Sequence, residues 1–321
     1  MKPLSFCTVM DHHYLTRGLA LYTSLRRHCP MCPLFVLCMD RATFHALDAL
    51  ALEGLRPVPF EDVADERLRQ ASKDRTVKEF SVTCKSFFTL WLLRQNREIE
   101  LLSFVDGDLF FFSHPGLLLD QMGQGSVAVT EHRFPARLEP HTSRDYGVFN
   151  GGWVCFRRDA RGLACLEDWC GRCLEWCFDR VEDGKYGDQK YLEEWPRRFD
   201  GVVVLKHKGA NLAPWNVEDY RIRLRDGQVM ADDDPVIFYH FSGLRRVRRW
   251  LYQSGLMLPA EGALRKWVYR PYLRTLERWE KQVGRHREPD CGFQTSFDGY
   301  LDIPRHLWSG RMLWKVPVRW W

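Results

Sequence analysis

Two aspartates one residue apart, Asp106 and Asp108, interrupt an apolar run from Leu101 to Phe112. Such a run is typical of a buried strand, and burying two like charges at its end is costly unless a cation neutralises them. Residues i and i+2 of an extended backbone project to the same side, so both carboxylates can reach one ion. Gly107 between them leaves room for a ligand to approach the backbone. Carboxylate oxygens suit Mg²⁺ or Mn²⁺, which keep positions open for substrate phosphates, so the pattern predicts a metal-diphosphate site.

The alternative interpretation of this motif is a solvated Asp-Gly turn that follows a strand. It is disfavoured because residues 109 to 112 resume the apolar run instead of turning polar.

The composition indicates an ordinary globular chain. Of its 321 residues, 45% are hydrophobic and 28% are charged, which fits one large domain or one domain with an appendage. No apolar stretch approaches the roughly 20 residues needed to span a bilayer. The first ten residues lack the long apolar core of a signal peptide. We therefore expect a cytoplasmic protein whose eleven cysteines are reduced thiols.

Two cysteine pairs, Cys29-x2-Cys32 and Cys170-x2-Cys173, have the spacing of zinc ligands. The second pair lies in a segment, 163 to 177, whose apolar residues recur with helical periodicity, so we expect these thiols in the core. The first pair falls in a loop between a helix and a strand. Core packing is therefore favoured over a structural zinc that joins the two pairs.

The first part of the chain alternates predicted strands and helices. This order predicts a mostly parallel sheet covered by helices on both faces, in which ligands bind beyond the carboxyl ends of the strands. Asp11 and the Asp106/Asp108 pair both follow strands, so two distant segments are expected to meet at one crevice. The expected elements are strands at 4–10, 34–38, around 57 and in the apolar run 101–112 that carries the Asp pair, helices at 15–27, 41–52 and 81–94, and an acidic, exposed segment at 61–78.

Later segments carry further polar residues at predicted element ends. Asn150 opens a strand together with two glycines that allow close backbone approach. Asp188 precedes a predicted helix in an N-cap-like position and, as a cap alone, would be unremarkable. His240 ends a strand beside Gly243 and Arg246, which suits a metal ligand and a phosphate clamp. The alternative for that segment is a surface histidine with solvated arginines.

Taken in order, these pieces resemble the GT-A glycosyltransferases, most closely those of glycosyltransferase family 8, over about residues 3 to 250. The five markers occur in the family's order and with compatible spacing. They are Asp11-His12-His13-Tyr14, Asp106-Gly107-Asp108, Phe149-Asn150-Gly151-Gly152, Gly187-Asp188-Gln189 and His240-x-x-Gly243-x-x-Arg246.

The resemblance implies an α/β fold with a GT-A type, Rossmann-like, mostly parallel sheet flanked by helices. Residues 1–250 would form the nucleotide-sugar-binding and catalytic domain. Residues 251–321 would form a helical, basic and tryptophan-rich C-terminal extension.

The resemblance also assigns site residues. Asp106, Asp108 and His240 would hold Mn²⁺ or Mg²⁺ against the diphosphate of a nucleotide-sugar. Asp188 and Gln189 would be the catalytic pair. The other positions of the markers named next would bind the donor. Asp11 and Tyr14 match positions at the base, which is normally uracil. Asn150, Asp188 and Gln189 match the pocket around the transferred sugar. Gly243 and Arg246 match the phosphate-binding turn.

Three positions depart from the family pattern. Arg246 stands where Lys is usual, which keeps the charge but changes the geometry, and His13 stands where Asn is common. An Arg that often precedes the Asp pair is replaced by Phe87, with Lys85 nearby as a substitute.

The activity implied is metal-dependent transfer of a sugar, from a UDP-sugar, to a saccharide or lipid-linked acceptor. By analogy the setting would be bacterial surface glycan assembly. Family 8 likeness implies retention at the anomeric carbon, with Gln189 near the reacting face. An inverting enzyme would need a carboxylate base, for which Asp188 and Glu131 are the candidates.

Other classes compete with a transferase. The Asp pair is similar to that of haloacid-dehalogenase phosphatases, but there a Thr or Val follows the second Asp by two residues, where this chain has Phe110. Asp11-His12-His13 is similar to the DHH phosphoesterases, whose further metal motifs are not found in order. A non-catalytic module that binds a nucleotide or, through the basic tail, nucleic acid is the third alternative, although no nucleic-acid partner is expected.

The positive charge is confined to the end of the chain. Residues 245–321 hold 16 Lys and Arg against 7 Asp and Glu, and seven of the thirteen tryptophans, whereas residues 1–244 hold 31 against 35. This composition is typical of a segment that lies in the interface of an anionic membrane, which predicts a peripheral contact with the inner face of the cytoplasmic membrane. The alternative is that the tryptophans pack onto the catalytic domain. Pro271 is expected to interrupt the amphipathic stretch 267–282.

Overall fold

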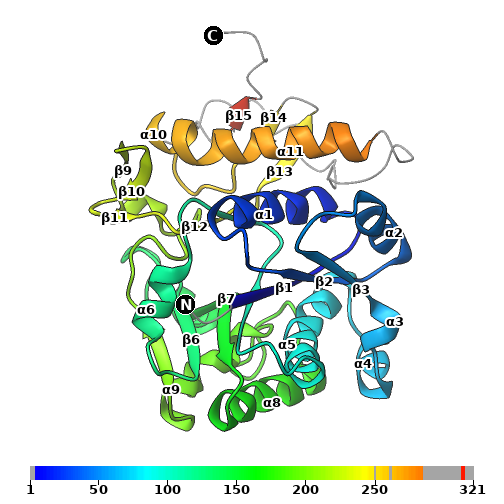
Figure 1. The fold of residues 1–321 in the computed structure, drawn as a ribbon. Coiled ribbons are helices and arrows are strands. Elements are labelled where there is room, and N and C mark those ends of the chain that lie inside the picture. Colours follow the sequence, from blue (N-terminus) through cyan, green and yellow to red (C-terminus); the bar gives the residue numbers. More distant parts are fainter. Residues whose placement is uncertain (1–3, 249–250, 260–261, 285–311, 315–321) are drawn as a thin grey trace.

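A central seven-stranded sheet organises the fold in a computed structural model that describes residues 4–248, 251–259, 262–284 and 312–314 (Figure 1). Its order is β3-β2-β1-β4-β7-β6-β8. All neighbours pair in parallel except β7, which runs antiparallel to both β4 and β6. The prediction of a mostly parallel sheet is confirmed. The strands are β1 (Leu4–Met10), β2 (Leu34–Cys38), β3 (Leu55–Pro59), β4 (Leu101–Val105), β6 (Val127–Glu131), β7 (Phe149–Arg157) and β8 (Val202–Leu205).

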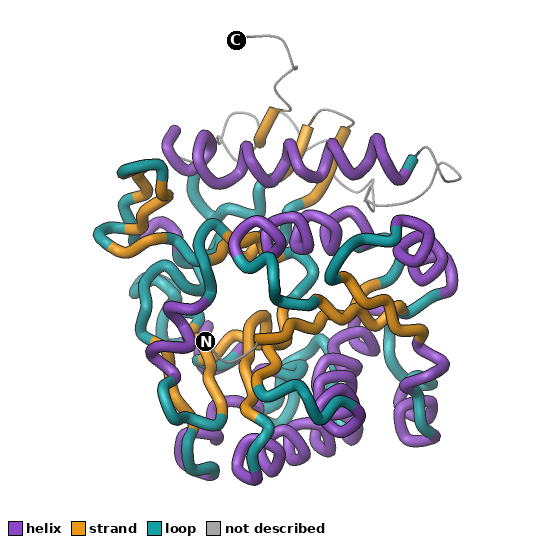
Figure 2. Tube along the Cα trace, viewed as in Figure 1, coloured by secondary structure: helices purple, strands orange, loops and turns teal. Residues whose placement is uncertain are grey.

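Helices cover both faces of this sheet, as Figure 2 shows by the helices on either side of the strands. On one face, α1 and α2 pack over β1 and β2, with Leu19 and Leu25 fully buried. On the other, α5 and α8 bury Phe88 and Trp169. The helices are α1 (Leu15–His28), α2 (Arg41–Leu50), α3 (Phe60–Val63), α4 (Glu66–Ala71), α5 (Val77–Gln95), α6 (Gly116–Met122), α7 (His141–Tyr146), α8 (Ala160–Glu175) and α9 (Trp195–Arg198), with 3-10 turns η1 (Gln189–Glu194) and η2 (Val217–Asp219).

Local chemistry explains where α5 begins. Thr76 caps the helix by accepting a hydrogen bond from the Glu79 backbone N–H, and the Glu79 carboxylate accepts one from the Thr76 N–H. This capping box starts the helix four residues before the predicted residue 81. The expected exposed segment 61–78 is also more regular than predicted, because it contains most of α3 and all of α4.

The short strands that the structure describes form three smaller sheets, separate from the central one. The pair β5 (Leu109–Phe111) and β12 (Phe238–His240) is antiparallel, with His240 opposite Leu109. This pairing positions the site described below. The others are β9 (Ile222–Arg225), β10 (Gln228–Ala231) and β11 (Asp234–Pro235) in one sheet, and β13 (Arg245–Arg248), β14 (Leu251–Gln253) and β15 (Met312–Trp314) in another.

The end of the described chain packs onto α1. A helical stretch comprises α10 (Gly262–Leu264), a π-helical turn η3 (Arg265–Tyr269) and α11 (Arg270–Val283), which runs along α1 in Figure 1. Trp279 is buried, and its Nε1 donates to Thr23 Oγ1 at 2.8 Å. Pro271 does not end the helical stretch, which continues on both sides of it, but the regular α-helical pattern is interrupted by the π-helical turn η3 just before Pro271.

The packing interpretation of the tail therefore holds for Trp279. Four further tail tryptophans, at 250, 308, 320 and 321, lie outside the described residues. The membrane contact of residues 245–321 and the division of the chain at residue 250 both stay predictions. Among the helices that the structure describes, none has an apolar stretch of the length that crossing a bilayer requires.

The cysteines behave in two ways. Cys170, Cys173 and Cys177 are buried in the core around Trp169, as predicted, and Cys165 is buried there too. The expectation of reduced thiols is wrong for Cys29 and Cys32, which form a disulfide with each other. The turn at 29–32, closed by the Cys32 N–H on the Cys29 carbonyl, brings the two thiols together. Because Cys29 and Cys32 are joined in a disulfide, they cannot act as thiolate ligands. The hypothesis of a zinc shared with Cys170 and Cys173 is therefore wrong too.

Candidate functional site

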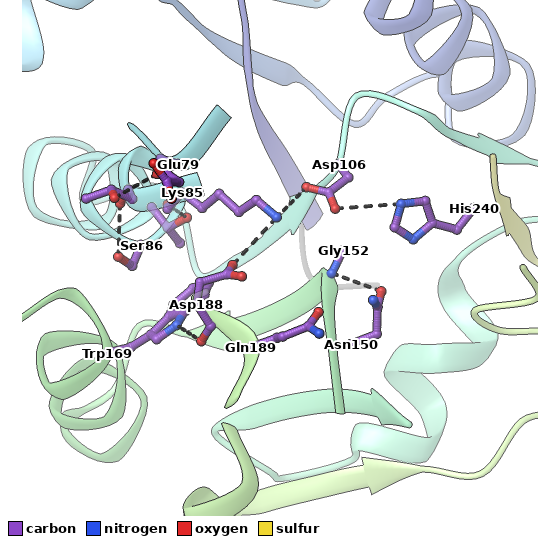
Figure 3. Close-up of polar contacts among 12 residues, drawn as sticks. Glu79, Lys85, Ser86, Asp106, Asn150, Gly152, Trp169, Asp188, Gln189 and His240 are labelled. Atoms are coloured by element: carbon purple, nitrogen blue, oxygen red, sulfur yellow. Dashed lines mark hydrogen bonds and ion pairs between the residues drawn. The ribbon is translucent and has the colours of Figure 1, made fainter. Parts of the chain in front are cut away.

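Three potential ligands converge at the carboxyl end of β4. Asp106 and Asp108 lie in the turn between β4 and β5, and His240 lies at the end of β12. Figure 3 shows the His240 ring facing Asp106. His240 Nε2 lies 3.1 Å from Asp108 Oδ1 and 3.7 Å from Asp106 Oδ2. One ligand atom from each residue lies within 4.8 Å of the others. The structure thus brings together the three residues expected to bind metal.

This donor set fits a hard divalent cation. Two carboxylates and one imidazole are suitable ligands for Mn²⁺ or Mg²⁺, and both Asp108 and His240 are 6% exposed. Burial by itself would raise the pKa of Asp108, but His240, through its charge and hydrogen bond, together with the charges of Arg17 and Lys85, outweighs burial and lowers that pKa. Burial would lower the pKa of His240, but Asp108 raises it above its ordinary value. A protonated His240 would offset the negative charge of the two aspartates, as a divalent metal ion would.

Lys85 links the Asp pair to Asp188. Its Nζ, carried by α5, lies 2.7 Å from Asp106 Oδ1 and 3.6 Å from Asp188 Oδ2, and its side chain is 11% exposed. Burial by itself would lower the pKa of Lys85, but the two carboxylates raise it by more than burial lowers it. The net pKa is above the ordinary value, so the ammonium stays charged. Burial raises the pKa of Asp188 to about 6, although Lys85 opposes that shift. Figure 3 shows Lys85 extended between the two aspartates.

Two glycines of β7 make the close packing possible. A Cβ on Gly151 would lie 2.9 Å from Asp188 Oδ2, and one on Gly152 would lie 2.7 Å from His240 Cε1. Real Cβ atoms do not approach so closely, so side chains here would displace Asp188 and His240. The two glycines at the start of this strand thus allow the close approach that the sequence predicted.

Asp188 and Gln189 lie at the start of η1. Asp188 occupies the N-cap position of this turn, as predicted, but its side chain makes no cap hydrogen bond. Its backbone carbonyl instead accepts the Trp169 Nε1–H at 2.9 Å, and its carboxylate faces Lys85. The Gln189 amide donates to the Tyr146 carbonyl at 2.7 Å, which joins it to the end of α7.

Asn150 is held by a residue that sequence reasoning did not single out. Its Oδ1 accepts the Gly152 N–H at 3.0 Å, and its Nδ2 lies 3.1 Å from His132 Nε2. Burial lowers the pKa of His132 to about 3, so the ring is neutral and can accept the Asn150 N–H. The only available signal was the richness of residues 131–146 in Arg and His. Glu131, the other candidate base, pairs with Lys206 at 2.9 Å.

The first marker lies beside the Asp pair. Asp11 Oδ1 accepts the backbone N–H groups of His13 and Tyr14 at 3.0 and 3.1 Å, so it shapes the loop after β1. Tyr14 is 40% exposed, and a Cβ on Gly107 would lie 3.5 Å from its ring. The predicted meeting of these two distant segments is confirmed.

The turn after β12 also contacts the Asp pair. The Phe241 N–H donates to the Asp108 carbonyl at 3.0 Å, and the turn closes through Gly243, whose φ of +72° favours glycine. Arg246 follows on β13, and its Nη1 donates to the Glu280 carboxylate of α11 at 2.7 Å. Gly243 thus lies in a turn attached to the Asp pair, whereas Arg246 pairs with the C-terminal helix.

Two curated relatives cover most of the chain. The uncharacterised protein YfnD of Bacillus subtilis is 31% identical over 316 residues, which are 95% of this chain and 96% of that protein. YfnF of the same organism, also uncharacterised, is 33% identical over 249 residues, 76% of this chain and 82% of that protein. No protein-family model matches the sequence.

Solved structures identify the fold. The galactosyltransferase LgtC, solved in complex with donor and acceptor sugar analogues, superposes with a TM-score of 0.55 at 16% identity, over 89% of this chain and 98% of LgtC. The glycosyltransferase GlyE of Streptococcus pneumoniae superposes with a TM-score of 0.51 at 14% identity, over 88% of this chain and 64% of GlyE. The architecture is the GT-A fold of nucleotide-sugar transferases, as the resemblance implied.

Proposed function

This chain belongs to the same protein family as YfnD and YfnF of Bacillus subtilis, and within that family we propose that it is a metal-dependent glycosyltransferase. The observation that carries the proposal is the convergence of Asp106, Asp108 and His240 at the carboxyl end of β4 in a GT-A fold. A sugar would pass from a UDP-sugar to a saccharide or lipid-linked acceptor. The biological setting that we propose, by analogy, is bacterial surface glycan assembly on the cytoplasmic side of the membrane.

Asp106, Asp108 and His240 would hold Mn²⁺ or Mg²⁺. The ion, when bound, would offset the negative charge that develops on the leaving diphosphate. Asp11 and Tyr14 would bind the base, since they lie in the loop that contacts Gly107. Gly243 and Arg246 would complete the phosphate-binding turn, which is attached to Asp108 through Phe241.

The histidine ligand makes metal binding depend on pH. His240 must lose its proton to coordinate the ion, and Asp108 holds the pKa of His240 above its ordinary value. We therefore expect Mn²⁺ binding at pH 6 to release about one proton, and the affinity to fall about tenfold per pH unit below that pKa. Calorimetric titrations in two buffers of different ionisation enthalpy measure the released protons. His207, a partly buried histidine outside the cluster of Asp106, Asp108 and His240, provides the control in His207→Asn. Mn²⁺ binding at pH 6 without proton release would contradict the role of His240.

Asp188, Gln189 and Asn150 would surround the transferred sugar. Lys85 fixes the Asp188 carboxylate beside Asp106, which supports a sugar pocket next to the metal site. We propose retention at the anomeric carbon, with Gln189 near the reacting face. The catalytic work would then be positioning of the acceptor hydroxyl and stabilisation of the departing diphosphate.

Donor hydrolysis tests this function without knowledge of the acceptor. UDP-glucose, UDP-galactose and their N-acetyl forms, incubated with the protein and Mn²⁺, are expected to include one donor that slowly yields UDP and free sugar, because water replaces the missing acceptor. Proton NMR before mutarotation should show the α anomer first. The β anomer would refute retention and leave the fold assignment intact, whereas absence of binding to any nucleoside diphosphate would refute the transferase. Chelation of the metal is the control.

A further inference from the structure

Another buried cation, the guanidinium of Arg17, lies in the proposed donor site. Arg17 belongs to the first turn of α1, three residues after Tyr14, and its side chain is 12% exposed. Neither the sequence motifs nor the family resemblance singles it out.

Three segments of the proposed site meet at this guanidinium. Arg17 Nη1 lies 4.0 Å from Asp108 Oδ2, and Nη2 donates to the Leu244 carbonyl at 2.6 Å. Its Cζ lies over the Tyr14 ring, 4.7 Å from the centroid. Arg17 therefore contacts the residues proposed for the metal, the phosphate turn and the base.

The charges around Asp108 are divided between its two oxygens. His240 Nε2 lies 3.1 Å from Oδ1, whereas Arg17 Nη1 faces Oδ2. A guanidinium has five N–H donors in a rigid fork, so it can hold a backbone carbonyl and still interact with an anion beside Asp108. A lysine ammonium in the same place would be a point charge without that planar geometry.

Arg246 is placed less favourably for the same task. Its guanidinium is paired with Glu280, whose side chain is 18% exposed. The Glu280 carboxylate therefore already offsets the positive charge of Arg246, the charge that the family resemblance would use to bind the diphosphate.

We propose that Arg17 supplies the fixed positive charge that meets the donor diphosphate, and that it positions the turn 241–244 beside that group through its bond to the Leu244 carbonyl. The inference rests on the proposed function. Under this proposal Arg17 contributes more than Arg246 to binding the negative charge of the diphosphate, a task that the resemblance gives to Arg246.

Binding measurements on the full chain test this role through two ligands whose responses should differ. Loss of a cation 4.0 Å from Asp108 should leave Mn²⁺ binding unchanged or tighter, because repulsion of the ion falls. The same change should weaken UDP binding at least about tenfold, because the diphosphate loses a charge-assisted partner. We therefore expect Arg17→Gln to show opposite trends for Mn²⁺, measured by electron paramagnetic resonance, and for UDP, measured by calorimetry with and without Mn²⁺. Arg17→Lys should recover part of the UDP affinity.

A matched control lies on the same helix. Arg26 pairs with Glu53 at 2.9 Å near the other end of α1, so Arg26→Gln should bind both ligands as the unaltered protein does. Arg246→Gln should weaken UDP binding less than Arg17→Gln; the reverse ranking would overturn the inference.

The remaining outcomes are also decisive. Equal UDP binding by the unaltered protein and Arg17→Gln would overturn the role of Arg17 and leave the donor site standing. Loss of both Mn²⁺ and UDP binding in Arg17→Gln would mark a merely structural residue and would also overturn it. Failure of the unaltered protein to bind UDP with Mn²⁺ would instead reject the UDP donor of the proposed function. If Arg17→Gln does not fold, Arg17→Lys decides: UDP binding weakened several-fold with unchanged Mn²⁺ binding supports the role, and unchanged UDP binding overturns it.

Discussion

Replacement of Asp108 by Asn is expected to weaken Mn²⁺-dependent binding of UDP at least about 100-fold. Loss of residues that merely orient metal ligands typically costs 10- to 100-fold in affinity, so loss of a ligand should cost no less. Asn keeps the shape of the side chain but removes the charge that faces His240 and Arg17. The Asp108 backbone carbonyl still accepts the Phe241 N–H, so the turn is preserved. Calorimetric titration of UDP with and without Mn²⁺ measures the effect.

Asp120 offers the control for this variant. It is exposed on α6, so Asp120→Asn should leave Mn²⁺-dependent UDP binding unchanged. Circular dichroism should show the native spectrum for both variants. Undiminished binding by Asp108→Asn would eliminate the Asp pair as the metal site.

Replacement of Lys85 by Met is expected to lower the free energy of unfolding by about 3 kcal/mol at pH 7.5, because removing one partner of a buried charge cluster leaves the others uncompensated. Asp106 and Asp188 would both lose their ammonium partner. The raised pKa of Lys85 places its stabilising contribution throughout the neutral range, below the pKa of a lysine in the unfolded chain. Urea unfolding at several pH values measures the loss.

The pH dependence of that loss follows from Asp188. Its pKa of about 6 is above the ordinary value, so protonation favours the folded state and its stabilising contribution disappears as the pH rises through 6. Lys85→Met removes the charge that opposes this shift, so the pKa of Asp188 should rise further. The destabilisation should therefore be largest above pH 6 and shrink in acid, and Mn²⁺ should restore part of it by neutralising Asp106.

Two variants on α5 control for this experiment. Lys78 pairs with Asp179 at the surface with its side chain 70% exposed, so Lys78→Met should change the unfolding free energy by less than about 0.5 kcal/mol. Lys85→Arg keeps the positive charge, so its free energy of unfolding should fall much less than that of Lys85→Met. Equal stability of the Lys85→Met and Lys78→Met variants would contradict the buried charge bridge.

Local pattern was enough for the first half of the fold. The predicted strands at 4–10 and 34–38 match β1 and β2 to the residue, and β4 occupies the start of the predicted strand in the run 101–112, because mainly apolar runs between polar ends allow little other structure. The alternation of these strands with helices predicted the mostly parallel sheet. The doublet of aspartates at the end of an apolar run likewise predicted a cation site, since the cost of burying like charges does not depend on the rest of the fold.

The sequence was less informative where partners are distant along the chain. His240 reaches Asp108 only because β12 pairs with β5, and a strand pattern does not specify which strand it pairs with; the family resemblance, and not the spacing, indicated that meeting. The antiparallel direction of β7 is another such choice. It brings Gly151 and Gly152 against Asp188 and His240.

The charge partners were decided by tertiary structure alone. Lys85 bridges Asp106 and Asp188, Arg17 faces Asp108, and Arg246 turns to Glu280. Each pair joins residues from different elements, and its energy depends on burial and on distances of 3 to 4 Å that no periodicity encodes. The sequence by itself determined which residues carry charge and which strands lie in the core. The packing of α1, α5 and α11 around the sheet decided which of those charges meet.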